Sequence, residues 1–159
     1  MLNKFESFQK YCVRWILSEE FLRYNTYETY IQKCREVKLL PLSSLFAFND
    51  IILFHKIIYE LIPIKLPNYL SFYNGSTRLR SSHLDSLSIV SSLQPSRFNE
   101  VYLKKSFYYR THTEWNALPY DIRNISNSVQ FKTALDKHFW KHILDSDETD
   151  FDEFDFVGD

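Results

Sequence analysis

Glycine is nearly absent from this sequence of 159 residues, which contains 2 Gly, 2 Cys and 1 Met. Gly158 is the second-last residue, so Gly75 is the single glycine in the remainder of the sequence. Loops that hold phosphate groups need several positions where the backbone adopts a positive φ or approaches a ligand closely. The nucleotide-binding patterns G-x-x-x-x-G-K-S/T and G-x-G-x-x-G are therefore excluded, as are collagen-like and disulfide-rich proteins.

Cysteines and long apolar runs are equally scarce. Cys12 and Cys34 lie within apolar helical patterns, which favours two buried thiols over a disulfide. Charged residues interrupt the start of the chain, and proline and charged residues interrupt its most apolar stretch, residues 39–62, whereas a membrane-spanning helix needs about 20 apolar residues. We therefore expect an intracellular protein, nuclear or cytoplasmic, that is neither secreted nor bound to a membrane.

Aromatic residues and an uneven distribution of charge are what the sequence does contain. There are 14 Phe, 11 Tyr and 3 Trp, and the formal net charge is -1. Residues 145–159 hold six Asp, two Glu and no basic residue, a charge of -8, which leaves 19 basic and 12 acidic residues in 1–144, a charge of +7. A basic body suggests a polyanionic partner, nucleic acid above all, for which the acidic tail could compete.

Apolar residues spaced three and four positions apart predict helices at 3–17 and 27–38. The stripe of the first helix that we expect to face the core consists of Phe5, Phe8, Cys12, Trp15 and Ile16. The most apolar stretch, residues 45–62, is predicted to form a central helix that Ser43 or Ser44 caps and that prolines stop.

Less regular sequence follows this central helix. We expect one further helical turn at 69–73, and a long Ser-rich loop with one or two short strands at 74–96. A helix that contains Phe107 and ends at Pro119 precedes a last helix at 128–144, whose inward residues are Val129, Phe131, Leu135, Phe139 and Ile143. The predicted fold is mainly α: a small irregular domain of four to five helices at 1–144, with a Ser-rich loop or short β-hairpin insertion, and a disordered acidic tail at 145–159.

Patterns typical of catalysis or metal binding are weak. His138 and His142 stand at i and i+4, as zinc-binding histidines do, but position 139 holds Phe where the H-E-x-x-H motif has Glu. The carboxylates of the tail lack the fixed geometry that acid–base or metal catalysis demands. We therefore expect no enzyme activity, no metal ion, no cofactor and no small-molecule substrate.

Basic residues interleaved with aromatic residues form the best candidate site. Such cations bind phosphates while tyrosine rings, here Tyr108 and Tyr109, stack on bases. The alternative is that the aromatic residues belong to the core and the cations are solvated. The candidate contacts to nucleic acid are Arg78, Arg80, Lys104, Lys105, Arg110, Lys132, Lys137 and Lys141.

A series of short motifs extends over residues 2–144. The main motif is Trp115-Asn116-Ala117-Leu118-Pro119, with Phe107 and Arg110 before it and Ser128, Phe131, Lys132 and Leu135 after it. Upstream motifs are Glu6, Gln9, Arg14 and Ile16, then Leu39 to Leu42, then Thr77 and Arg78. In order and spacing these residues resemble the C-terminal region of the reverse-transcriptase polyprotein of non-LTR (LINE-type, jockey-like) retrotransposons. One departure is that Ser43, Ser44 and Phe46 stand where the family usually carries an Arg-Arg pair.

The resemblance implies a noncatalytic, auxiliary RNA- or DNA-binding module of target-primed reverse transcription. In that family an upstream palm with a Y-x-D-D-like motif carries the polymerase chemistry and an N-terminal endonuclease nicks the target, and this sequence encodes neither. We assign the motif of Trp115, Asn116, Leu118 and Pro119 to the architecture of the protein, because a Trp packed beside a helix end and an Asn bonded to its local backbone explain it without a ligand. Phe107, Phe131 and Leu135, which belong to the same family motif, are predicted to be structural as well. Two alternatives stay open. One is a protein-interaction adaptor whose tail docks Phe151, Phe154 and Phe156 on a partner or folds back on the basic body; the other is a remnant reading frame without a selected function.

Overall fold

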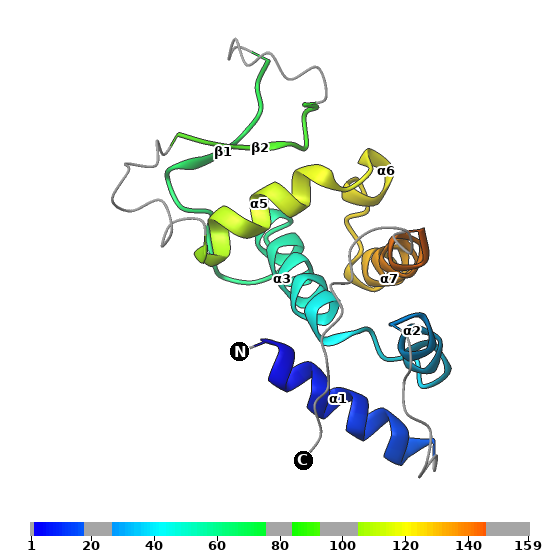
Figure 1. Cartoon of the computed structure of the whole chain (residues 1–159). Coiled ribbons are helices and arrows are strands. Elements are labelled where there is room, and N and C mark those ends of the chain that lie inside the picture. Colours follow the sequence, from blue (N-terminus) through cyan, green and yellow to red (C-terminus); the bar gives the residue numbers. More distant parts are fainter. Residues whose placement is uncertain (1, 18–26, 76–83, 93–104, 146–159) are drawn as a thin grey trace.

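The computed structural model describes residues 2–17, 27–75, 84–92 and 105–145 of the chain (Figure 1). The predicted disordered tail at 145–159 falls outside these ranges except for Asp145, which belongs to the last helix and not to the tail. The helices are α1 (Leu2–Ile16), α2 (Tyr27–Glu36), α3 (Leu42–Ile58), α5 (Phe107–Ala117), α6 (Tyr120–Arg123) and α7 (Ser128–Asp145), and the strands are β1 (Leu70–Phe72) and β2 (Ile89–Ser91). The fold is thus mainly α with a small β-hairpin, which confirms the predicted fold class.

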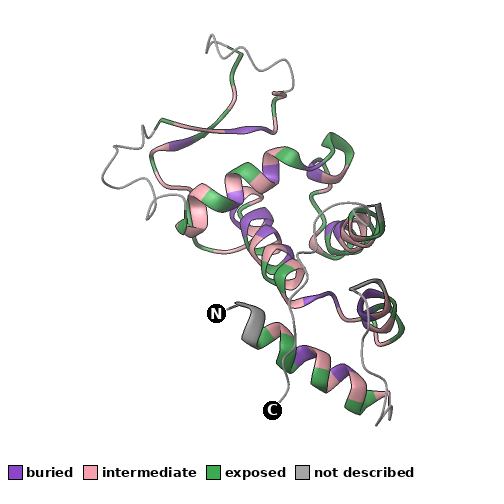
Figure 2. Cartoon of the chain, in the orientation of Figure 1, coloured by how far each residue is buried: buried purple, intermediate pink, exposed green. Residues whose placement is uncertain are grey.

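Helix α3 occupies the centre of the fold because it is apolar on nearly all of its sides. Its residues Phe48, Ile51, Phe54 and Ile57 are buried. Helices α5 and α7 pack against it, and α1 contacts it as well (Figure 1). The buried residues accordingly concentrate on α3 and on the faces that its neighbours turn toward it (Figure 2).

Two groups of buried side chains form the core. The larger group joins α3 to α5, α7 and the hairpin, and its buried members are Leu40, Phe48, Ile51, Phe54, Leu70, Ile89, Trp115, Leu118, Phe131 and Leu135. The smaller group lies between α1 and α2 and consists of Val13, Tyr30, Ile31 and Cys34. Trp140 and Ile143 of α7 pack against both groups, so α7 connects them.

The boundaries of α3 differ from the prediction of 45–62. The helix begins at Leu42, because the fixed backbone of Pro41 (φ -51°, ψ 146°) occupies the N-cap position and its carbonyl accepts a bond of 2.8 Å from the Leu45 N–H. Ser43 and Ser44 are therefore residues of the first turn and not caps. The helix ends at Ile58 because Glu60 adopts a left-handed backbone with φ 53°.

Helices α2 and α3 end in the same way, without the glycine that usually terminates such helices. After α3, the Glu60 N–H donates to the Ile57 carbonyl (3.2 Å) and the Leu61 N–H to the Lys56 carbonyl (2.8 Å). After α2, Lys38 has φ 54° and makes the equivalent bond, and the Leu39 N–H donates to Cys34. These two bonds define the Schellman motif, in which a non-glycine residue at the left-handed position is strained.

The stretch 69–73 contains strand β1 (Leu70–Phe72) and not the predicted helical turn. Strand β1 pairs antiparallel with β2, with Leu70 opposite Ser91 and Phe72 opposite Ile89, and buried Leu70 and Ile89 face the larger core group. Strand β2 lies in the expected Ser-rich insertion at 74–96, of which residues 76–83 and 93–96 lie outside the described ranges. Helix α5 packs against β2.

The segment between α5 and α7 contains the short helix α6, to which Asp121 and Ile122 belong. Pro119 separates α5 from α6, and its carbonyl accepts the Ile122 N–H at 3.1 Å. The prediction that Val129 faces inward is wrong as well, because this side chain in the first turn of α7 is 75% exposed.

The predicted core face of α1 is wrong. Phe5, Phe8, Trp15 and Ile16 are all more than half exposed, whereas Gln9 and Val13 are buried. Gln9 is held by two bonds: its Nε2 donates to the Leu40 carbonyl (2.8 Å) and its Oε1 accepts from the Tyr30 hydroxyl (2.9 Å). Pairing of this amide with buried partners turns α1 so that much of its apolar stripe faces outward.

Candidate nucleic-acid interface

The start of α5 carries the predicted basic and aromatic cluster, and two of its cations are described. Lys105 and Arg110 are both exposed. Arg110 is paired, however, because its Nε donates to Asp50 Oδ2 of α3 at 3.1 Å, its Nη2 contacts the same oxygen, and its Nη1 donates to the Lys105 carbonyl at 3.1 Å. The guanidinium therefore ties the start of α5 to α3, and its charge is already compensated.

Glu114 lies one turn further along α5, in the same charged neighbourhood. Burial raises the pKa of its carboxyl, Arg110 lowers it and Asp50 raises it, with a net increase. Within the described part of the chain its Oε2 is buried without a hydrogen-bond partner. The contact between α3 and α5 thus brings two carboxylates to one guanidinium, which makes this part of α5 less attractive to phosphate than its sequence suggested.

The two tyrosines expected to stack on bases are both half-buried. The ring of Tyr108 packs against the larger core group and lies edge-on to Phe107, with 5.1 Å between ring centroids. The ring of Tyr109 lies edge-on to His112 at 5.2 Å. For Tyr108 the structure favours the core interpretation, while Tyr109 keeps part of its ring at the surface.

Helix α7 presents the predicted lysines more openly. Lys132, Lys137 and Lys141 are exposed, and no carboxylate within the described ranges pairs with any of them. Lys137 and Lys141 stand at i and i+4 and so share one face of the helix. Lys132 lies five residues earlier, about 140° around the helix at 3.6 residues per turn.

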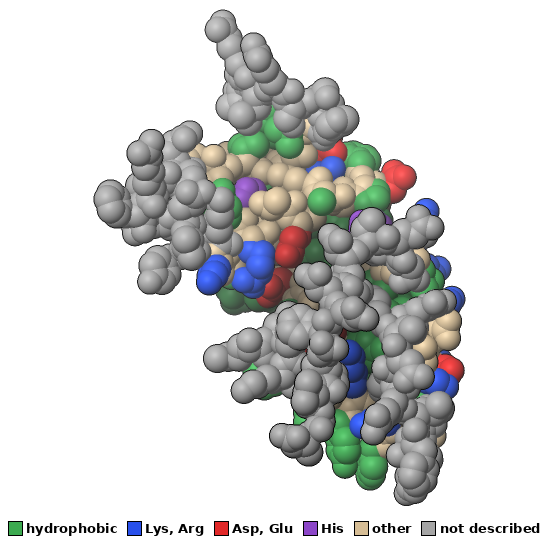
Figure 3. Space-filling view, in the orientation of Figure 1, with side chains coloured by type: hydrophobic (Ala, Val, Ile, Leu, Met, Phe, Trp, Pro, Cys, Tyr) green, Lys and Arg blue, Asp and Glu red, His purple; other side chains and the backbone are tan. Residues whose placement is uncertain are grey.

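The candidate cations therefore do not gather in one patch. Lys105 lies next to the start of α5, and the candidate lysines Lys132, Lys137 and Lys141 lie on α7. Helix α3 packs against both α5 and α7. On the face shown in Figure 3, Lys and Arg side chains occupy several separate positions. Arg78, Arg80 and Lys104 lie outside the described residues.

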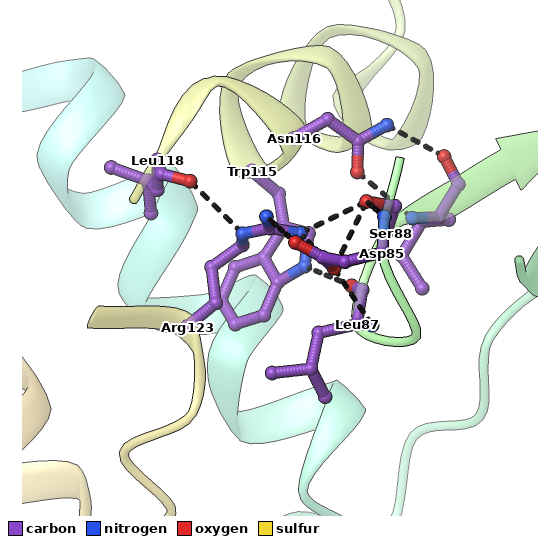
Figure 4. A network of polar contacts seen from close by, with 8 residues as sticks. Asp85, Leu87, Ser88, Trp115, Asn116, Leu118 and Arg123 are labelled. Carbon is purple, nitrogen blue, oxygen red and sulfur yellow. Dashed lines mark hydrogen bonds and ion pairs between the residues drawn. The ribbon is translucent and has the colours of Figure 1, made fainter. Parts of the chain in front are cut away.

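The Trp-Asn-x-Leu-Pro motif holds the hairpin against α5 (Figure 4). Trp115 is fully buried, and its indole N–H donates to the Leu87 carbonyl at 2.9 Å. The Asn116 side chain accepts from the Ile89 N–H (2.8 Å) and donates to the Ile89 carbonyl (2.7 Å). The prediction that Asn116 bonds its local backbone is wrong, because its partner Ile89 lies 27 residues away in β2.

Arg123 also holds the hairpin in place, and the sequence analysis did not single out this residue. Its guanidinium is 3% exposed and donates to the Leu118 carbonyl (3.0 Å), to Asp85 Oδ1 (3.0 Å) and to the Ser88 hydroxyl (3.1 Å) (Figure 4). Burial raises the pKa of Asp85, but bonds from Arg123, the Leu87 N–H and Ser88 outweigh it and hold this pKa below its usual value. Arg123 lies in a helix of four residues, which is too short for a periodic pattern to indicate that this side chain is buried.

The remaining motif residues are architectural too. Leu118, Phe131 and Leu135 are buried in the larger core group, Phe107 packs against it, and Pro119 is the N-cap residue of α6.

His55 is a buried histidine that the sequence did not single out. Its ring stacks on Phe131, with 3.9 Å between centroids, and its Nε2 lies 2.7 Å from the Ile125 carbonyl, to which it must donate. Nδ1 is buried and has no hydrogen-bond partner among the described residues. Burial lowers the pKa of His55, the bond to Ile125 raises it and Lys56 lowers it, with a net decrease.

The histidine pair of α7 stands as its spacing predicted, with 6.2 Å between the ring centroids of His138 and His142. Burial, His142 and Lys141 together lower the pKa of His138. Within the described ranges no group of three or more His, Cys, Asp or Glu side chains could hold a metal ion.

In the described part of the chain, no helix has both the length and the apolar character needed to cross a bilayer.

No protein-family model, curated protein or solved structure significantly matches this chain.

Proposed function

We propose that this chain is a noncatalytic module that binds RNA or DNA, with a role like that of the C-terminal segment of the retrotransposon reverse transcriptases that its motifs resemble. The charge of +7 on residues 1–144 supports a polyanionic partner. The buried Trp115 and Phe131 support the architectural role that we assign to the motif residues.

The observation that carries the proposal is the pair Lys137 and Lys141. Both ammonium groups lie on one exposed face of α7, and neither is neutralised by a carboxylate in the described part of the chain. Phosphates repeat along a nucleic-acid strand, so two adjacent cations on a rigid helix bind a backbone without reading its sequence. Arg110 is the weaker candidate because Asp50 already compensates its charge.

A binding titration at two salt concentrations tests the proposal with single-stranded RNA and duplex DNA as probes. We expect measurable affinity that falls as salt rises, and we expect Lys137→Gln/Lys141→Gln to weaken it and to reduce the slope of log K against log salt by about 0.7–0.9 per lost contact. Lys65→Gln is the matched control, since Lys65 is exposed elsewhere in the fold. Absence of binding, or affinity that does not respond to salt, would overturn the proposal.

A further inference from the structure

The outward face of α1 is an apolar surface that the described elements leave uncovered. Its members are more than half exposed: Phe5 57%, Phe8 66%, Tyr11 59%, Trp15 77% and Ile16 56%. Full burial of an aromatic side chain removes about 150–250 Å² from water, so these residues expose roughly 500 Å² together. Contiguous apolar patches above a few hundred Å² mark interaction sites in soluble proteins.

We propose that this face of α1 is the docking surface for the acidic C-terminal segment of the same chain, residues 146–159. The occupant has the chemistry that the face requires. Phe151, Phe154 and Phe156 supply the apolar contact, and each of them has Asp or Glu as its sequence neighbour on at least one side. This proposal does not depend on nucleic-acid binding.

Charge complementarity favours this occupant over a second copy of the chain. Helix α1 carries Lys4, Lys10 and Arg14 against a single acidic residue, Glu6. Of these cations, Lys10 faces α2, since its Nζ lies 5.0 Å from the centre of the Tyr30 ring. Two α1 helices facing each other would bring like charges together, whereas residues 146–159 bring seven carboxylate side chains and no cation.

The segment starts close to α1. It follows Asp145, the last residue of α7, and Ile143 in the final turn of α7 packs against the core group that contains Val13 of α1. Fourteen extended residues reach up to about 45 Å, whereas the 15-residue helix α1 is about 22 Å long. The three Phe residues can therefore reach the α1 face within one molecule.

Trp15 is the most exposed side chain of the face, so its fluorescence reports whether the face is covered. We would measure acrylamide quenching in the full chain and isolate the contribution of Trp15 by subtracting the signal of the Trp15→Phe chain. The other two tryptophans, the fully buried Trp115 and the partly buried Trp140, are common to both chains, so the subtraction removes their signal. We expect Trp15 to be shielded, and we expect Phe151→Ser/Phe154→Ser/Phe156→Ser to raise its quenching constant severalfold. High salt should raise it too, because the ion pairs are screened.

The matched control replaces the same three Phe residues with Leu, which keeps apolar side chains at these positions and should keep Trp15 shielded. Sedimentation of both triple variants and of the parent chain separates docking within one molecule from self-association. A monomer whose Trp15 becomes accessible only in the Ser variant supports the proposal. Equal quenching in parent and Ser variant overturns it, and so does shielding that rises with protein concentration, which would assign the face to a second copy.

Discussion

His55 shows how one side chain couples this core to pH. Its Nε2–H bonds the Ile125 carbonyl, which leaves Nδ1 as an unprotonated nitrogen surrounded by aromatic rings. Protonation would place a positive charge against Phe131 with no acceptor for the second N–H in the described part of the chain. The neutral ring is therefore the form that the fold accommodates.

We expect the free energy of unfolding to fall as the pH drops below about 6.5, the ordinary pKa of histidine. The folded pKa of His55 is lowered, so the unfolded chain takes up a proton first, and stability decreases by up to about 1.4 kcal/mol per pH unit for this one proton. Well above pH 6.5 both the folded and the unfolded chain hold this histidine neutral, so its contribution to the free energy of unfolding no longer changes with pH. Urea denaturation at several pH values between about pH 5 and pH 8, the range in which histidine usually titrates, measures the effect.

His55→Phe should flatten this pH profile even if it changes the overall stability. His138 also has a lowered pKa, so a smaller slope should remain. His112→Phe is the control, because it leaves His55 in place and should leave most of the slope unchanged. An unaltered profile in His55→Phe would show that His55 does not carry the pH dependence.

The environment of a residue in the candidate site could be predicted only where it depends on the residue's own helix and not on the packing of other elements. Lys137 and Lys141 lie on the polar face of an amphipathic helix, and periodicity alone predicts their exposure. The partner of Arg110 is Asp50, 60 positions away, and that of Arg123 is Asp85, 38 positions away. Pairings at such distances depend on the packing of α3, α5 and the hairpin, which no local pattern encodes.

At the level of elements, the scarcity of glycine has a measurable consequence at the helix ends. Glu60 terminates α3 with φ 53°, a conformation in which a Cβ crowds the following backbone. We expect Glu60→Gly to stabilise the protein by about 1 kcal/mol, because removal of this strain exceeds the added entropy of the unfolded chain. Thermal unfolding by circular dichroism is the measurement.

Glu60→Ala separates strain from side-chain effects. It removes the same exposed carboxylate but keeps the Cβ, so it should give little or none of the gain. Equal stabilisation by Ala and Gly would mean that the charge of Glu60, and not its backbone, is unfavourable.

Elements with strong periodicity were predictable in type, but not in orientation. The stripe of α1 correctly indicated a helix, yet periodicity identifies an apolar face without showing which other element is available to cover it. Gln9 decides the orientation instead, through bonds to Tyr30 and Leu40 that arise only in the folded chain. Strand β1 was missed because three residues are too few for a period of two to be recognised.

For the molecule as a whole, the two core groups differ in size and depend on α7 to hold them together. The group between α1 and α2 has four buried members, and Trp140 and Ile143 join it to the larger group. Regions with few buried apolar contacts open at lower free energy than the rest of a protein. Helices α1 and α2 should therefore be the first of the described elements to open.

We expect Trp140→Ala to reduce hydrogen-exchange protection in α1 and α2 far more than in α3 and α5. Trp140 is partly buried, so the loss should be about 1–3 kcal/mol, below the cost of a fully buried aromatic residue. Phe139→Ala is the matched control, because Phe139 packs against the larger group and meets Phe48 at 5.7 Å between centroids. Equal loss of protection in all helices of the Trp140 variant would contradict a two-part core.

The Asn116 contact has a consequence for the solubility of the hairpin. Neighbouring residues of a strand direct their backbone groups to opposite edges. The Ser88 carbonyl accepts from the Tyr73 N–H and the Ser92 N–H donates to the Tyr69 carbonyl, on either side of β1, so the N–H and C=O of Ile89 point away from β1. Open strand edges of this kind recruit strands from other chains and initiate aggregation. The carboxamide of Asn116 occupies both groups of Ile89 as a peptide of a third strand would, and so closes the edge to strand addition at that point.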